Sequence, residues 1–208
     1  MKPMNTGEAR NRPEPPQRQP NIYGVILCQG DSLTYGSRDP DGMSYPLYLA
    51  RLLSKRHAQT WVTVNLGVPG ECWAEIWRRN YCELMSYPAA AEICLWAGTN
   101  DAWMGRSVEQ SLTACEAVLD QCRAAGRFVY LATLAGKRGF GTTREPWHMN
   151  EAIAQLNAGY GRLAAERRLA LVDLTALPGE HFVDGIHLSQ EGNRWVAEQF
   201  AQAIEARR

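Results

Sequence analysis

A serine that follows an apolar run is the first residue of this chain whose surroundings suggest chemistry. The segment Gly30-Asp31-Ser32-Leu33 comes directly after a run rich in branched residues, 25–28, which is typical of a buried strand. A serine hydroxyl is a poor nucleophile unless a base removes its proton and donors stabilise the developing oxyanion. Catalysis at Ser32 therefore requires partners elsewhere in the chain. Without them, Asp31 and Ser32 would be ordinary capping residues of the next helix.

A base with its own acid lies near the end of the chain, in the segment Asp184-Gly-Ile-His187. His187 could take the proton of Ser32 and return it to the leaving group. Asp184 could turn back to accept a hydrogen bond from the other ring nitrogen. His181 is the alternative base, although no acid precedes it by three residues.

Donors for an oxyanion follow two further apolar runs. The segment 65–70 ends in Gly70, and the segment 98–101 contains Asn100. Gly70 and Ser32 could each offer a backbone N–H, and Asn100 could offer its side-chain amide. Because Gly70 has no side chain, a substrate oxygen could approach its backbone closely.

Strand-like and helix-like segments alternate from residue 21 onward. We expect strands at 22–29, 60–65, 91–97, 128–134 and 169–174, and helices that begin near residues 44, 72, 107, 146 and 189. Strands that are separated by helices run parallel and are covered on both faces. The sequence therefore predicts an α/β protein, a three-layer α/β/α sandwich with a parallel sheet of about five strands. Such a sheet gathers the loops after its strands at one edge.

The four segments together resemble the four motif blocks of the SGNH (GDSL) hydrolase superfamily, of the esterase/lipase type, in the family's order and over residues 30–187. The resemblance implies a flavodoxin-like fold, no metal and no organic cofactor. It implies Ser32 as nucleophile, His187 as base and Asp184 as its partner, with an oxyanion hole formed by Ser32, Gly70 and Asn100. The ordinary α/β-hydrolase fold fits less well, because its G-x-S-x-G elbow has glycine where this chain has Thr34.

The function expected from this resemblance is a serine esterase that hydrolyses small or short-chain carboxylic esters through an acyl-enzyme on Ser32. A carbohydrate O-deacetylase or an acyl-thioesterase with the same triad is the alternative, and transfer to an alcohol also stays open. A saccharide- or lipid-binding module without catalysis is the alternative from another class, since a fold alone does not determine function.

Aromatic residues near these segments are candidates for substrate contact. Trp73, Trp103 and Trp147 start from loops near the expected cleft and could wall an apolar pocket. Packing of helices on the sheet is the alternative for such residues. Asp31 could contact substrate or only order its turn. The loop 135–145, with Lys137, Arg138 and Arg144, could form an entrance or a solvated loop.

Composition limits the remaining possibilities. The chain has 208 residues, 45% of them hydrophobic, with 22 basic and 22 acidic side chains. We expect a single domain over 21–208 and a disordered, Pro-rich tail over 1–20, which contains five of the eleven prolines.

Balanced charge gives no sign of a nucleic-acid partner, and no apolar run is long enough to span a membrane. Six cysteines without metal-site spacing are expected to be free thiols. Together with the missing signal peptide they favour a cytoplasmic protein that acts on a small-molecule ester.

Overall fold

The computed structural model describes residues 22–137 and 146–208, with the side chains of 22, 23, 146 and 147 excepted. The expected tail at 1–20 lies outside these residues, as do Arg138 and Arg144.

A five-stranded sheet forms the centre of the molecule, with the order β2-β1-β3-β4-β5 and every pairing parallel. In the register, Gly30 at the end of β1 pairs with Gly67 of β2 and with Trp96 of β3. These three strands therefore end level with one another, and the loops that follow them start from one edge. The strands are β1 (Ile22–Gly30), β2 (Thr60–Gly67), β3 (Glu92–Trp96), β4 (Phe128–Ala132) and β5 (Ala170–Val172).

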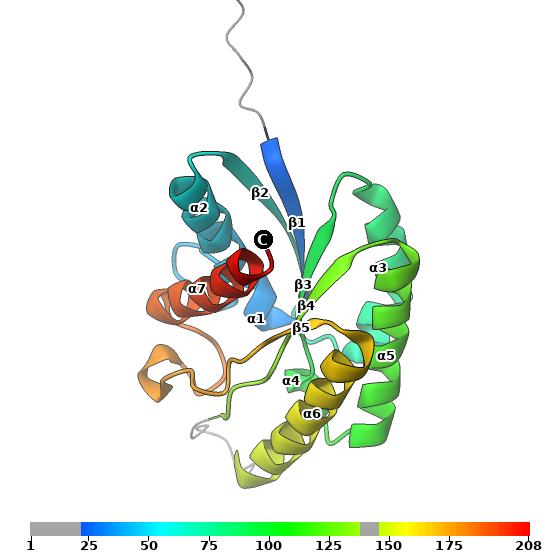
Figure 1. The fold of residues 1–208 in the computed structure, drawn as a ribbon. Helices are drawn as coiled ribbons and strands as arrows, with labels where there is room; N and C mark the ends of the chain where they lie inside the picture. The colour runs from blue at the N-terminus through cyan, green and yellow to red at the C-terminus, as the bar shows by residue number, and fades with distance from the viewer. Residues whose placement is uncertain (1–21, 138–145) are drawn as a thin grey trace, which may run out of the picture.

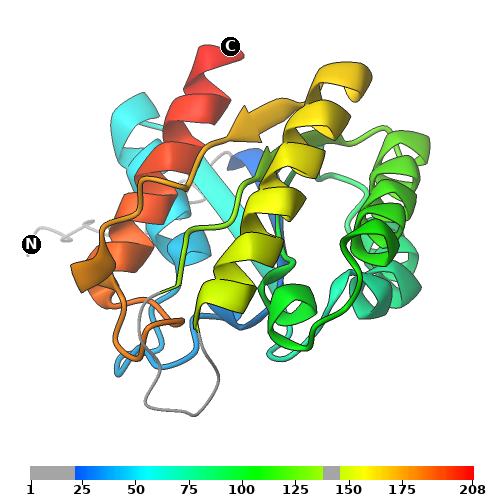
Figure 2. The same ribbon diagram turned by 90° about the horizontal axis from the view of Figure 1, so that it is seen from below.

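Helices cover both faces of the sheet (Figure 1). One face carries α2 (Tyr45–His57) and α7 (Gln190–Ala206), which pack on each other. The other face carries α3 (Trp73–Ser86), α5 (Val108–Ala124) and α6 (Pro146–Arg167). Figure 2 looks onto the edge where the strands end and shows the sheet between the two helical layers. The predicted three-layer α/β/α sandwich is confirmed.

Three short elements at this edge were not expected from the sequence: α1 (Ser32–Tyr35), α4 (Thr99–Trp103) and the 3-10 turn η1 (Gly179–His181). Each is about one turn long, too short to show a helical periodicity. Strand β4 is shorter than the expected 128–134, because Asn157 of α6 binds both backbone groups of Leu134, with distances of 2.7 and 2.8 Å. Leu134 therefore pairs with a side chain rather than with the neighbouring strand.

The core lies on both sides of the sheet. All five residues of β3 are buried, and the ring of Tyr45 packs between Trp96 and Phe200. All six cysteines are free thiols, and all but Cys82 are buried. Among the described helices, none has both the length and the apolar character that crossing a membrane requires.

Candidate active site

The turn after β1 presents Ser32 at the edge of the sheet. Ser32 is the first residue of α1, and Asp31 caps this helix because its Oδ1 atom accepts the backbone N–H of Leu33 at 2.9 Å. A Cβ atom at Gly30 would overlap the carbonyl oxygen of Trp96 and the Oγ1 atom of Thr34. Glycine is therefore required before Asp31, because a side chain at this position would displace the turn that leads to Ser32.

The segment after β5 brings His187 to this hydroxyl. The Nε2 atom of His187 lies 3.1 Å from Ser32 Oγ, and its Nδ1 atom lies 2.7 Å from Asp184 Oδ2. The other carboxylate oxygen of Asp184 accepts the backbone N–H groups of Ile186 and His187 at 3.0 and 2.7 Å. The three side chains form a continuous chain of hydrogen bonds. His181, the alternative base, lies in η1.

The charge of Asp184 determines which ring nitrogen of His187 carries the proton. Partial burial opposes ionisation of Asp184, but hydrogen bonds from the backbone and ring of His187 and from the Ile186 N–H outweigh it, so its pKa is lowered. An ionised carboxylate accepts a hydrogen bond and cannot donate one. Nδ1 therefore carries the proton, and Nε2 is left to accept the proton of Ser32. The Arg38 side chain lies on the open side of Asp184, with Nε 3.6 Å from Oδ2.

The connection between β2 and α3 lies beside the nucleophile turn. The backbone N–H of Val68 donates to the Gly30 carbonyl at 3.0 Å. Gly70 follows with φ +85°, and nothing lies within 4 Å of where its Cβ would be, so this backbone is open to an approaching group.

Asn100 in α4 is tied to this same connection. Its Nδ2 atom donates to the Glu71 carbonyl at 2.9 Å, one residue after Gly70. The amide has two N–H donors, so one remains for a further acceptor. The neighbouring Asp101 accepts the backbone N–H of Trp73 at 3.1 Å, which makes it a cap for α3. The expected oxyanion donors are thus linked by direct hydrogen bonds between their loops.

Asn65 and Arg79 brace these loops from behind. Asn65 donates to the Tyr35 carbonyl and to Ser44 Oγ at 3.2 and 3.1 Å, and accepts from the Gly67 N–H at 3.0 Å. Arg79 of α3 donates to the carbonyls of Leu66 and Gly30 at 2.9 and 3.4 Å. Nothing in the sequence distinguishes Arg79 from a solvated helix residue, so its contact with the loops could be found only from the structure.

The aromatic residues considered for substrate contact occupy different environments. Trp73 is fully buried, and its Nε1 atom donates to Tyr160 Oη at 2.7 Å, which in turn donates to the Ala97 carbonyl at 3.0 Å. We therefore assign Trp73 to the core, in place of the expected pocket wall. Trp103 is partly buried against the core. Trp147 lies in α6, and its side chain is outside the described residues.

Two charged residues near the site are more buried than the sequence suggests. Asp31 has no exposed surface, and Lys137 is 3% exposed. One of the two interpretations of residues 135–145, that of a solvated loop, is therefore wrong for Lys137. Burial raises the pKa of Asp31 to about 6, against the Leu33 hydrogen bond and the attraction of Lys137, which lower it. Burial lowers the pKa of Lys137 to about 8, against the attraction of Asp31 and Asp184.

The arrangement as a whole suits nucleophilic attack on a carbonyl group. It combines a hydroxyl, a base oriented by a carboxylate, and open donors on neighbouring loops. Across residues 22–137 and 146–208, no three His, Cys, Asp or Glu side chains gather as metal ligands would.

Known proteins share both the sequence pattern and the fold. A family model described as the GDSL-like lipase/acylhydrolase family matches residues 28–195, a range that contains all four segments. The structure of Est24, a carbohydrate acetylesterase from Sinorhizobium meliloti, is similar with a TM-score of 0.75 and 18% identity, over 89% of this chain and 100% of that chain. The structure of the aryl esterase of M. smegmatis is similar with a TM-score of 0.76 and 17% identity, over 88% of this chain and 99% of that chain. For the structure of TesA, the TM-score is 0.73 and the identity 20%, over 88% of this chain and 98% of that chain. No curated protein sequence matches the chain significantly.

Proposed function

Because this chain belongs to the GDSL-like lipase/acylhydrolase family and is an SGNH-type serine hydrolase, we propose that it hydrolyses small carboxylic esters through an acyl-enzyme on Ser32. The observation that carries the proposal is the chain of two hydrogen bonds from Asp184 through His187 to Ser32, at 2.7 and 3.1 Å.

In the first half of the reaction, Ser32 Oγ attacks the ester carbonyl carbon while His187 Nε2 takes the hydroxyl proton. The C–O bond to the alcohol then breaks, and His187 returns the proton to the departing oxygen. In the second half, His187 removes a proton from water, and the resulting hydroxide attacks the acyl carbon. Ser32 leaves with its proton restored and the carboxylic acid is released. Asp184 stabilises the imidazolium that forms twice in this cycle.

The developing oxyanion needs donors that are already in place. In this proposal the backbone N–H groups of Ser32 and Gly70 and the remaining N–H of Asn100 serve as those donors. The bond from Asn100 to the Glu71 carbonyl supports this assignment, since it fixes the amide without using both of its hydrogens.

Small substrates are favoured because two of the connections at this edge, those that carry Gly70 and Asn100, are short. Residues 68–72 join β2 to α3 and residues 97–98 join β3 to α4, so neither could form a cap over a long acyl chain. Removal of acetyl groups from carbohydrates is the second candidate, favoured by the likeness to the carbohydrate acetylesterase Est24.

The experiment is hydrolysis of p-nitrophenyl esters from acetate to decanoate, and of acetylated sugars, by the wild type and by Ser32→Ala. We expect the wild type to prefer short chains, the variant to be inactive, and the rate to fall at acid pH, where protonated His187 cannot accept the serine proton. A rate that is flat from pH 5 to 9, or an active variant, would overturn the proposal. Acetate release from sugars at a higher kcat/KM than from p-nitrophenyl acetate would select the second candidate.

A further inference from the structure

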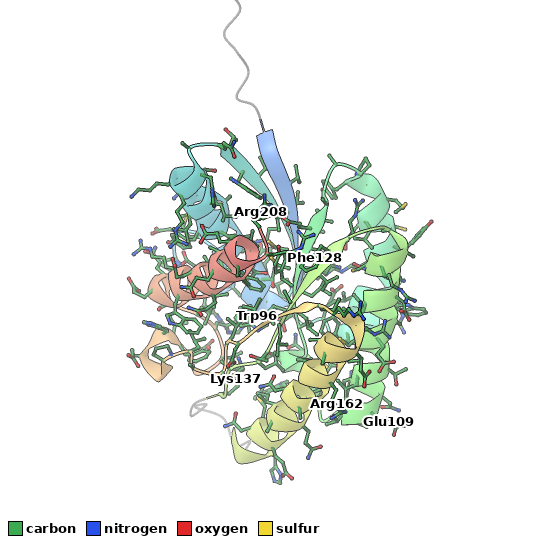
Figure 3. The ribbon with its side chains drawn as sticks, viewed as in Figure 1. Trp96, Glu109, Phe128, Lys137, Arg162 and Arg208 are labelled. Carbon is green, nitrogen blue, oxygen red and sulfur yellow. The ribbon has the colours of Figure 1, made fainter. Side chains whose placement is uncertain are left out.

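Lys137 is a buried cation at the edge that carries the proposed site, and the reaction described above does not use it. It follows β4 at the end of the stretch 133–137 and is 3% exposed, whereas lysine is almost never buried without a partner. Its Nζ atom makes no hydrogen bond with any described residue and lies 5.1 Å from the centre of the Phe182 ring. Figure 3 shows Lys137 at the end of the molecule where the strands finish. An ammonium in such a place is costly, so it needs a compensating interaction.

The backbone around Lys137 is held in place by α6. Asn150 binds it at both groups, because its Oδ1 accepts the Lys137 N–H at 2.7 Å and its Nδ2 donates to the Lys137 carbonyl at 3.0 Å. Asn157 binds Leu134 in the same two-bond manner. The two asparagines are seven residues apart, which places them two turns apart on one face of the helix. The fold itself therefore fixes where the Lys137 side chain starts.

Two acids attract the ammonium. The first is Asp31, directly before Ser32, which is fully buried and whose Oδ2 atom also has no hydrogen-bond partner among the described residues. The second is Asp184, on the segment that contributes Phe182. Neither carboxylate is within 4 Å as a described ion pair, but both attract the ammonium. The charge of Lys137 thus acts on the turn of the nucleophile and on the segment of the base.

The other charged groups around these residues are few. Asp101 of α4 repels Asp31, and Arg38 pairs with the open side of Asp184. From α6, the neighbour of Lys137 is the neutral Asn150. Since the pKa of Lys137 is about 8 and that of Asp31 about 6, the ammonium and both carboxylates carry their charges together near pH 7.

We propose that Lys137 is a positioning residue whose charge joins the Asp31 turn to the Asp184 segment. The inference rests on the proposed function. Attraction to both acids holds two segments, far apart in the sequence, at the spacing that the Ser32–His187 hydrogen bond requires. Without this charge, the turn that carries Ser32 and the segment that carries His187 lose an attraction that they share, and the two reacting side chains are held together less often.

The test measures how fast a small fluorophosphonate labels Ser32 at pH 7, by intact-protein mass, together with kcat and KM for p-nitrophenyl acetate. Lys137→Met keeps the length and removes the charge, and Lys137→Arg keeps the charge. Lys55→Met, at an exposed lysine of α2, controls for the change in net charge. We expect Lys137→Met to lower the labelling rate and kcat by about tenfold, with KM little changed. Lys137→Arg and Lys55→Met should keep the wild-type labelling rate and kcat.

The outcomes separate the two proposals. If Ser32 of the wild type is neither labelled nor active on esters, the proposed function is overturned and this inference with it. If the wild type is labelled and Lys137→Met keeps the wild-type labelling rate and kcat, this inference alone is overturned. A loss in Lys137→Arg as large as that in Lys137→Met overturns it as well, because the shape of the side chain and not its charge would then be responsible. Near-ultraviolet circular dichroism of each variant establishes that the fold is intact.

Discussion

The Nε2 atom of His187 lies 3.1 Å from Ser32 Oγ although two strands separate the strands that carry them. Ser32 follows β1 and His187 follows β5, and the order β2-β1-β3-β4-β5 puts β3 and β4 between them. The segment after β5 therefore crosses the ends of two strands to reach the serine. The proposed catalysis depends on this crossing.

Ser32→Ala should lower kcat/KM for p-nitrophenyl acetate by about a thousand-fold or more, because no nucleophile remains. The free energy of unfolding should stay within about 1 kcal/mol of wild type, since the hydroxyl fills little volume. Urea denaturation followed by tryptophan fluorescence measures the second quantity. Ser86→Ala, at an exposed serine at the end of α3, is the matched control and should keep full activity.

Asp184→Asn should lower kcat by about 10²- to 10⁴-fold with a smaller effect on KM. An amide at this position presents an N–H to His187 Nδ1 as readily as an oxygen, so the ring loses its fixed proton. Stopped-assay kinetics at pH 7 and 9 measure the loss. Asp120→Asn, on the exposed side of α5, should behave as wild type. Equal losses in both variants would argue against a role for the Asp184 carboxylate.

Asn100→Ala should reduce kcat by about 10²- to 10³-fold, because a donor to the oxyanion is removed while the nucleophile stays intact. The variant also loses the hydrogen bond to the Glu71 carbonyl, so urea denaturation must accompany the kinetics. Retention of Ser32 labelling by a fluorophosphonate at a reduced rate would show that the triad persists. A kcat within a factor of three of wild type would remove Asn100 from the oxyanion hole.

Asp31→Asn should stabilise the protein at neutral pH and not at pH 4. The pKa of Asp31 is raised by burial from 3.8 to about 6, so between these values the folded state holds a proton that the unfolded state has released. Stability contributed by this proton is lost as the pH rises through that window. The variant should therefore gain up to about 3 kcal/mol relative to wild type between pH 4 and 7.

This prediction is checked by urea denaturation of both proteins at half-unit pH intervals. Asparagine can still accept the Leu33 N–H, so the cap is preserved in the variant. Parallel stability curves over pH 4–7 would mean that Asp31 titrates as it does in the unfolded chain.

Tyr160→Phe should destabilise the protein by about 1–3 kcal/mol without changing the reaction's pH profile. The hydroxyl accepts from Trp73 Nε1 and donates to the Ala97 carbonyl in the buried interior, so its removal leaves two polar groups unpaired. Tyr81→Phe, at a tyrosine of α3 that is 56% exposed, provides the control and should leave the melting temperature unchanged.

The sequence predicted the layers of the fold because strands with branched residues alternate with amphipathic helices along the whole chain. It also predicted that the loops after β1, β2, β3 and β5 meet at one edge, which follows from parallel strands. The assignment of roles to Ser32, Asp184, His187, Gly70 and Asn100 stays a prediction until the variants are measured.

Contacts that depend on tertiary packing were beyond the sequence. Trp73 looks like other tryptophans near a loop, and only the position of Tyr160 on α6, 87 residues later, reveals its place in the core. Lys137 looks like a solvated loop residue, because Asn150, which binds its backbone, lies on a helix whose sequence pattern says nothing about that loop. In both cases the decisive neighbour comes from a distant element.

Asp184 and His187 are assembled by four consecutive residues, since the carboxylate of Asp184 binds the backbone and the ring of His187 within one turn. The geometry of the acid and the base is therefore set within a single turn, whereas the position of the serine relative to them depends on the rest of the fold. In evolutionary terms, a loop that acquires this turn gains both groups in a single event. If the fold places the histidine of this turn 3.1 Å from a serine hydroxyl, as it does here, the three side chains of a triad are present without a further substitution.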